Sequence, residues 1–78
     1  MWIRTQDKKK LMQITSFSIT RNYGGKLKFA VVGSIAGASA FSNLKIVGLY
    51  KTEDETLQEL DVIQKYLETG NTGVYQVN

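Results

Sequence analysis

The chain has 78 residues, ten of them Lys or Arg and seven Asp or Glu, and it contains no His and no Cys. A chain of this length forms one domain, expected to span residues 1–78, and folding buries only about 60% of its unfolded surface. Without Cys and His, the chain has no disulfide, no Cys/His zinc site, no Ser–His pair and no cysteine nucleophile. We therefore expect a protein that is not an enzyme, holds no cofactor or metal, and gains stability as a homo-oligomer.

The charge is divided unequally along the chain. Residues 1–51 carry nine Lys or Arg and one acid, Asp7, which gives +8, and residues 52–78 carry six acids and Lys65, which gives −5. One interpretation is a basic sheet beside an acidic helix, with the two layers neutralising each other. The other is a basic face that meets phosphate-bearing partners.

No stretch of the sequence predicts a membrane segment or a signal peptide. The longest uncharged run, Phe29–Leu44, is shorter than the roughly 20 residues of a spanning helix. The chain is charged by residue 4, and no apolar segment of a secretory signal follows. We expect a cytoplasmic protein, in the host cell cytoplasm if a phage encodes it, with no membrane partner.

The first half of the chain predicts strands. Residues 2–5 form a short strand, and residues 11–20 are rich in β-forming residues. In the second strand the alternation slips, because Met12 and Ile14 share one parity while Phe17 and Ile19 share the other. A β-bulge near residues 15–16 would place all four on one face. The alternative is a strand that is apolar on both faces and meets a second subunit on one of them.

Two further strands are expected after a tight turn. Gly24 and Gly25 can adopt the positive φ that a hairpin turn requires, so a strand is predicted over residues 26–32. Its residues Leu27, Phe29 and Val31 should point inward, and Lys26, Lys28 and Ala30 outward. Residues 33–43 are mostly small and form either a loop or an extension of this strand, and residues 44–50 form the next strand.

The second half of the chain predicts a helix. Thr52-Glu53-Asp54-Glu55 is a capping box, and Leu57, Leu60, Ile63 and Leu67 recur at helical spacing. Gly70 suits the helix end, and residues 74–77 form a last short strand. The expected fold is a single α+β domain of order ββββαβ, with an antiparallel sheet and one amphipathic helix packed on one face.

Two stretches carry a resemblance to a known family, the opening MWIRTQDKKKL and the later GLYKTEDETLQELDVIQKYLETG. They resemble a family of small proteins of Gram-positive bacteria and their phages and prophages, which begin Met-Trp-Ile-Arg-Ser-Gln and carry Gly-x-Tyr-x-Thr-Glu before an acidic helix. Thr5 stands here where Ser is commoner. The matching residues of the second stretch are Gly48, Tyr50, Thr52, Glu53, Leu60, Asp61, Ile63 and Gln64. The resemblance implies a phage or mobile-element accessory protein, and it brings no catalytic motif.

The opening stretch is the first candidate site. Trp2 and Arg4 should lie on one face of their strand and Ile3 on the other. An aromatic ring and a guanidinium on an open sheet face, close to Lys8, Lys9 and Lys10, suit a base and its phosphate. A Lys-rich turn is equally a device that protects a sheet edge, and Trp with Arg is equally typical of a subunit interface.

The second candidate site is the stretch Arg21-Asn22-Tyr23-Gly24-Gly25-Lys26. Its glycines expose backbone N–H groups between two cations and a ring, a composition that can hold a phosphate, although a plain hairpin turn has the same composition. Ser34 and Ser39, in the small-residue segment, could add hydrogen bonds to a polar ligand. The acidic residues of the helix lack the spacing of a calcium loop and predict a solvated helix face.

These features lead to one favoured hypothesis and two alternatives. The favoured one is a non-enzymatic, homo-oligomeric binding module that serves counter-defence by sequestering a phosphate-bearing small ligand, such as a nucleotide second messenger. Its ligand-binding residues would be Trp2, Arg4, Arg21, Asn22, Tyr23, Lys26, Ser34 and Ser39. The alternatives are a protein-binding inhibitor or adaptor of a host protein, and a weak nucleic-acid-binding protein.

Overall fold

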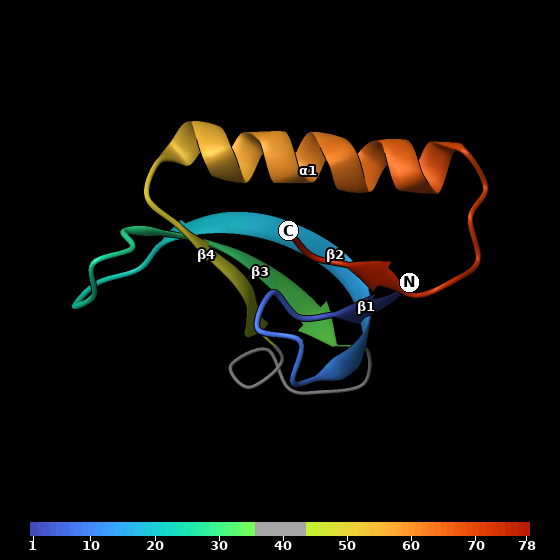
Figure 1. The fold of residues 1–78 in the computed structure, drawn as a ribbon, viewed down its shortest axis with the longest axis horizontal. Coiled ribbons are helices and arrows are strands. Elements are labelled where there is room, and N and C mark those ends of the chain that lie inside the picture. The colour runs from blue at the N-terminus through green and yellow to red at the C-terminus, as the bar shows by residue number, and fades with distance from the viewer. Residues whose placement is uncertain (36–43) are drawn as a thin grey trace.

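The chain folds as one sheet with one helix, and the α+β class predicted from the sequence is confirmed (Figure 1). The computed structural model describes residues 1–35 and 44–78, so Ser39 and most of the small-residue segment lie outside the described residues. Within the described part of the chain, no helix has the length and apolar character needed to cross a membrane. The elements, in chain order, are β1 (Trp2–Arg4), β2 (Leu11–Arg21), β3 (Phe29–Ile35), β4 (Leu44–Tyr50), α1 (Glu53–Glu68) and β5 (Tyr75–Gln76).

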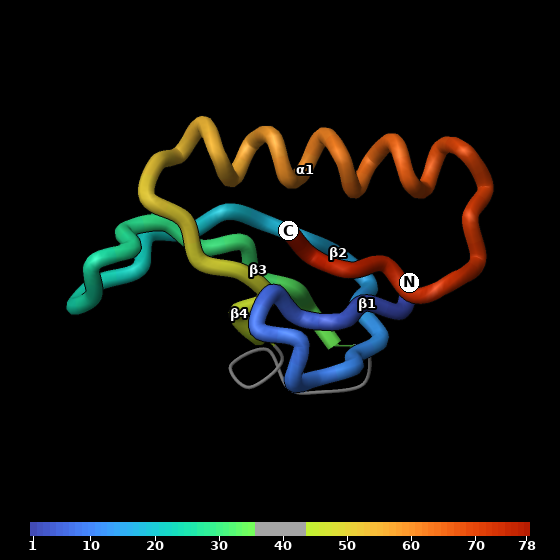
Figure 2. Tube along the Cα trace, in the orientation of Figure 1, coloured from blue at the N-terminus to red at the C-terminus, as the bar shows by residue number. Residues whose placement is uncertain are grey.

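The five strands lie in the order β4-β3-β2-β1-β5. Neighbours pair antiparallel except β5, which runs parallel to β1, so the sheet is mixed and the prediction of a wholly antiparallel sheet is wrong at this strand. The reason is the helix. It carries the chain from the β4 edge across the sheet to the far side of β1, as the trace in Figure 2 shows, so no hairpin joins β5 to β1. Only a tight hairpin forces its two strands to be antiparallel.

The bulge predicted in β2 is present. The pairing of β2 with β3 shifts register between Ile14 and Ser16. Ile14 lies in the core, and Met12 and Phe17 pack against it although their parities differ. The bulge therefore turns both halves of the strand toward the helix.

The hairpin between β2 and β3 is longer than the sequence predicts. Gly24 has the expected positive φ of 90°, but β3 begins at Phe29 rather than at residue 26. The reason is Asn22, whose backbone N–H donates to the Lys28 carbonyl (2.7 Å) and whose side-chain amide donates to the Leu27 carbonyl (2.9 Å). These bonds close a loop of residues 22–28, which we call the hairpin loop.

Ala30 was predicted to point outward, and it lies outside the core cluster, but it is not exposed. Ala30 is fully buried, because it lies in β3 between Thr20 of β2 and Leu49 of β4. A methyl group in the centre of a sheet is covered by its longer cross-strand neighbours even without a second layer.

The helix begins as the capping box predicts and ends at the predicted glycine. The Thr52 hydroxyl accepts a hydrogen bond from the Glu55 N–H, and Gly70 follows the helix with φ of 74°. The buried face differs from the expected one. Its fully buried residues are Thr56, Glu59 and Ile63, whereas Leu57 and Leu67 are 45% and 52% exposed. The helix is therefore rotated so that one side of its leucine stripe stays in solvent.

Candidate ligand-binding surface

The turn between β1 and β2 is held in one shape by hydrogen bonds. Asp7 accepts from the Thr5 hydroxyl (2.6 Å) and from the Lys9 N–H (2.9 Å), and the Thr5 N–H donates to the Lys10 carbonyl (2.9 Å). The same hydrogen bonds, with the charges of Lys9 and Lys10, lower the pKa of Asp7. Lys8 adopts a positive φ of 68° at the tip. Hydrogen bonds therefore fix the backbone of the turn, while the side chains of Lys8, Lys9 and Lys10 are exposed.

Trp2 and Arg4 lie beside this turn on the solvent face of β1. Ile3 is fully buried in the core, so its two neighbours point away from the helix, as the sequence predicts. Trp2 is 50% exposed. The Arg4 Nε–H donates to the Lys8 carbonyl at 2.9 Å, which fixes the direction of the guanidinium and leaves its terminal nitrogens for another partner. We call Trp2, Arg4, Lys8, Lys9 and Lys10 the basic turn surface.

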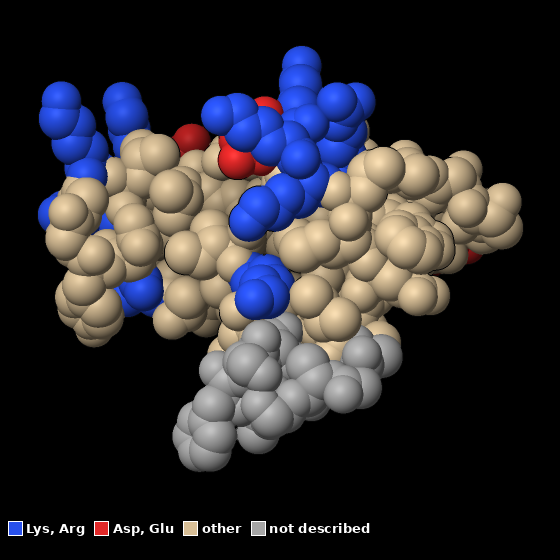
Figure 3. All heavy atoms as spheres, turned by 90° about the horizontal axis from the view of Figure 1, so that it is seen from below, with Lys and Arg blue, Asp and Glu red and all other residues tan. Residues whose placement is uncertain are grey.

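The basic turn surface lies on the side of the molecule opposite the helix. Figure 3 shows the face away from α1, where Lys and Arg side chains gather over the middle of the molecule. Beside the turn, a shallow depression of about 130 Å³ reaches β4 and is lined by Gln6, Lys10 and Ile46, among others. This face is open, so its ligand would lie on a surface and not in an enclosed pocket.

The second candidate site is at the other end of β2. Arg21, Asn22, Tyr23, Gly24 and Lys28 line a small hollow of about 230 Å³, in which the predicted Lys26 takes no part. The Arg21 guanidinium lies 5.4 Å from the centre of the Phe29 ring, a cation–π contact, and Tyr23 is 83% exposed. The Asn22 amide closes the hairpin loop, so its visible role is structural.

The two candidate sites are not brought together within one chain. The eleven residues of β2 separate them, a contour of about 36 Å at the usual rise of a strand, and Figure 1 shows the hairpin loop projecting from one end of the molecule. Ser34 lies near the end of β3, half-buried, where its carbonyl accepts from the Thr15 hydroxyl at 3.1 Å. A small ligand can therefore contact the basic turn surface or the hairpin loop of one chain, but not both.

Sequence reasoning missed a buried polar cluster. Glu59, expected on a solvated helix face, is only 3% exposed. Its carboxylate accepts from the Tyr75 hydroxyl (2.6 Å), the Asn78 N–H (3.2 Å) and the Asn78 side-chain amide (3.0 Å). The Tyr50 hydroxyl donates to the Asn78 carbonyl at 2.6 Å. The only sequence signal is that Glu59 shares the helix face of Thr56 and Ile63, at spacings of three and four residues.

A cleft of about 560 Å³ adjoins this cluster. It lies between the first half of α1, β4 and the end of the chain, and Gln6, Tyr50, Glu55, Gln58 and Val62 contribute to its walls. Every hydrogen-bonding group of the buried cluster is already paired, and no buried side-chain polar atom lacks a partner among the described residues. No group of three or more acids that could hold a metal ion occurs in the described ranges 1–35 and 44–78.

The two buried tyrosines, Tyr50 and Tyr75, predict that the free energy of unfolding falls at alkaline pH. Burial raises the pKa of Tyr50 and Tyr75 above the ordinary value of about 10, with the Glu59 carboxylate adding to the shift in both. The contribution of these two hydroxyl groups to the free energy of unfolding is complete below pH 10, where the unfolded chain also keeps their protons. It is lost above that pH because the unfolded chain ionises first, at most about 1.4 kcal/mol per pH unit for each tyrosine.

We therefore expect the urea midpoint to fall steadily as the pH rises above about 10, more steeply than in Tyr50→Phe/Tyr75→Phe. The comparison of both proteins by circular dichroism checks it. A wild-type midpoint that falls no faster than that of the double variant would contradict the assignment of these two hydroxyls.

No family model, no curated protein and no solved structure matches this chain.

Proposed function

We propose that the protein is a non-enzymatic binding protein whose ligand carries phosphate groups, and that the ligand binds at the basic turn surface. The observation that carries the proposal is the arrangement of Trp2 and Arg4 on one exposed strand face beside a preorganised turn with three lysines. An exposed indole stacks on a base, and a guanidinium whose direction is fixed pairs with phosphate at little entropic cost. In a phage or mobile-element setting, such binding would sequester a host nucleotide messenger and so act in counter-defence.

The open shape of the surface favours a second candidate ligand, a single nucleic-acid strand. The hollow beside the turn is small, and Trp2 is not among the residues that line it. Single strands bind to open, positively charged surfaces that carry exposed aromatic side chains. Salt separates the two ligands, because affinity for a strand falls steeply as counterions are released, whereas a ligand with two phosphates releases few.

The test uses Trp2, the only tryptophan of the chain, as its own fluorescent reporter. Wild-type protein is titrated with a cyclic dinucleotide, with an oligothymidylate and with inorganic phosphate. We expect quenching by one of the first two, and we expect Arg4→Gln to weaken that binding by about tenfold or more, as for a charge-assisted hydrogen bond.

The matched control is Lys65→Gln, which removes one charge from the last turn of α1, in the opposite layer. It should leave the affinity within about twofold, since exposed charges farther away than a Debye length are screened. Equal losses in the two variants would mean that net charge, and not the basic turn surface, carries the binding. Absence of quenching by every probe would overturn the proposal.

A further inference from the structure

We propose that two copies of this chain pair through the outer edge of β2, in antiparallel fashion about a two-fold axis at Ile19. Among the described residues, the backbone of residues 17–21 has a neighbouring strand on one side only. The pairing of the two copies does not depend on the proposed ligand binding.

The direction of the free backbone groups follows from the hydrogen bonds of the hairpin. Asn22 donates its N–H to the carbonyl of Lys28, so residue 22 faces β3. In an antiparallel pair, residues facing the same neighbour alternate, so Ser16, Ser18 and Thr20 also bond to β3. Phe17, Ile19 and Arg21 then point their N–H and C=O groups outward. The strand β1 covers this edge only as far as Ile14, which bonds to Met1.

In contrast to the free edge of β2, the outer edge of β4 is covered by Gln6. On the outer edge of β4, the Gln6 amide both accepts from the Leu49 N–H (2.8 Å) and donates to the Leu49 carbonyl (3.1 Å). The Gln6 N–H donates to the Val47 carbonyl at 2.9 Å. Free edges normally carry charged residues, above all Lys, or Pro, which hinder pairing. Within this free edge, residues 17–20 contain no charge and no Pro, and Arg21 lies at its end.

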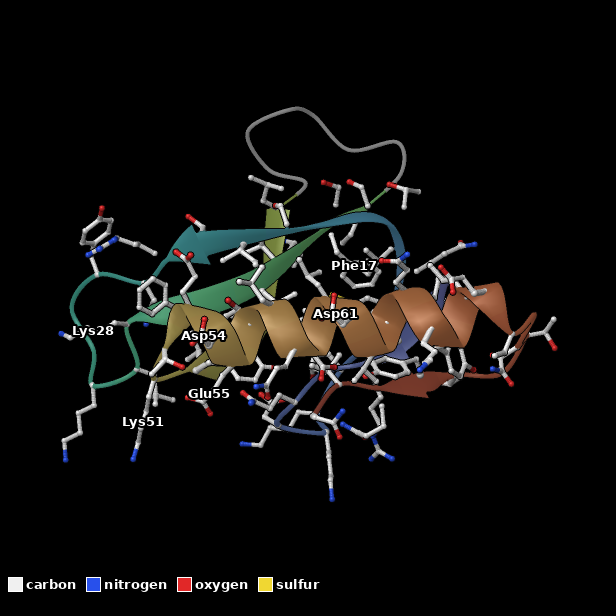
Figure 4. All side chains as sticks on the ribbon, turned by 90° about the horizontal axis from the view of Figure 1, so that it is seen from above. Phe17, Lys28, Lys51, Asp54, Glu55 and Asp61 are labelled. Carbon is white, nitrogen blue, oxygen red and sulfur yellow. The ribbon has the colours of Figure 1, made fainter. Side chains whose placement is uncertain are left out.

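An apolar strip borders this free edge. Phe17 and Ile19 are half-buried on the helix side of β2. On α1, Leu57 lies about 160° around the helix from Glu55, which lines the cleft by β4, so Leu57 points toward the opposite side. Figure 4 shows Glu55 on one side of α1 and Phe17 on the other. Leu57, at 45% exposed, and the half-buried Leu60 thus lie on the side of the helix that faces the edge.

The edge is complementary to itself, and this points to a second copy as its partner. Pairing about Ile19 places Phe17 opposite the partner's Arg21, and a guanidinium above a phenyl ring is favourable. The two Arg21 residues lie about 13 Å apart along the strands, farther than the Debye length at physiological salt. A two-fold axis also brings the leucine side of α1 against its own copy, as an isologous interface requires. The small core of a 78-residue chain gains buried apolar surface in this way.

The same register has a consequence that rests on the proposed function. Beyond Arg21, the same antiparallel direction carries the partner's hairpin loop toward the bulge of β2 and the place where Met1 starts β1. The partner's hairpin loop therefore lies against the beginning of β1, close to Trp2. The two candidate sites that one chain keeps apart would then form one composite site across the dimer.

The first test follows backbone amide exchange by NMR as the protein concentration is raised from about 10 µM to about 1 mM. We expect Phe17, Ile19 and Arg21 to gain protection by about tenfold or more, in step with the dimer fraction from sedimentation. Ser18 and Thr20, which bond to β3 in the monomer, should keep their rates and serve as internal controls. A chain that remains monomeric at the highest concentration, or a dimer in which the three outward amides still exchange freely, would overturn the proposal.

The second test compares two substitutions on opposite sides of α1. Leu57 and Val62 are 45% and 44% exposed, so Leu57→Glu and Val62→Glu introduce the same charge at similar exposure. We expect Leu57→Glu to weaken dimerisation by about tenfold or more and Val62→Glu to leave it within about twofold. Equal effects would exclude the leucine side of the helix from the interface. If the wild type dimerises but no probe quenches Trp2, the ligand proposal fails and the dimer stands.

Discussion

Tyr75→Phe is expected to lower the free energy of unfolding by about 2 to 3 kcal/mol, an effect larger than that of most single substitutions. The change removes one hydroxyl, which donates to the Glu59 carboxylate at 2.6 Å. Glu59 is 3% exposed, so no water replaces the lost donor and a buried charge is left with fewer hydrogen bonds. For a domain of this size the melting temperature should fall by about 10 °C or more.

The matched control for this prediction is Tyr66→Phe. The rings of Tyr66 and Tyr75 pack edge to face with centroids 5.1 Å apart. The Tyr66 hydroxyl donates to the carbonyl of Gly73 at an exposed position. Water can replace that bond, so its loss should cost less than about 1 kcal/mol. Urea unfolding of the three proteins at one fixed concentration measures the difference. Equal losses for the two variants would show that the Glu59 cluster has no special weight in stability.

Gly33→Ala should destabilise the chain by about 1 to 3 kcal/mol, because an added methyl group has no room. A Cβ at Gly33 would lie 2.7 Å from Cγ2 and 2.8 Å from Cδ1 of Ile14, and Ile14 is 1% exposed in the core. The loss exceeds the gain of about 0.4 to 1 kcal/mol that Ala brings by restricting the unfolded chain. Thermal and urea unfolding measure the net change.

Two further proteins give this prediction its control. At Gly73 an added Cβ meets only the Tyr66 hydroxyl, at 3.5 Å, so Gly73→Ala should be close to neutral. In the background of Ile14→Ala the penalty at Gly33 should largely disappear, which a double-mutant cycle reports as a coupling of about 0.5 to 3 kcal/mol. Full additivity of the two changes would mean that strain elsewhere, and not this contact, causes the loss.

The charge pattern of the sequence is organised by the sheet and the helix. The exposed acids Glu53, Asp54 and Glu55 lie in the first turn of α1, while the Lys-rich turn lies on the opposite face of the molecule (Figures 3 and 4). The acidic part of the chain therefore forms the helix, and the basic part forms most of the sheet and its turns.

Local features of the sequence predicted most of the elements. The slip of parity between Ile14 and Phe17 indicated a bulge as one of two alternatives, and the capping box identified the first residue of α1. These predictions succeeded because a bulge and a helix cap are set by residues within a few positions of one another. The hairpin was predicted less well, since the side chain of Asn22 and not the glycine pair decided where β3 starts.

The sequence by itself determined the absence of Cys and His, the order of the elements, the residues that cap the helix and the division of charge. The tertiary structure alone decided that β5 runs parallel to β1, that Glu59 is buried, and that the two basic sites lie at different ends of β2. The physical reason is the distance in sequence between the partners. Glu59 is buried by Tyr75 and Asn78, and β4 is capped by Gln6 from 43 residues away, so these contacts exist only once the sheet has formed.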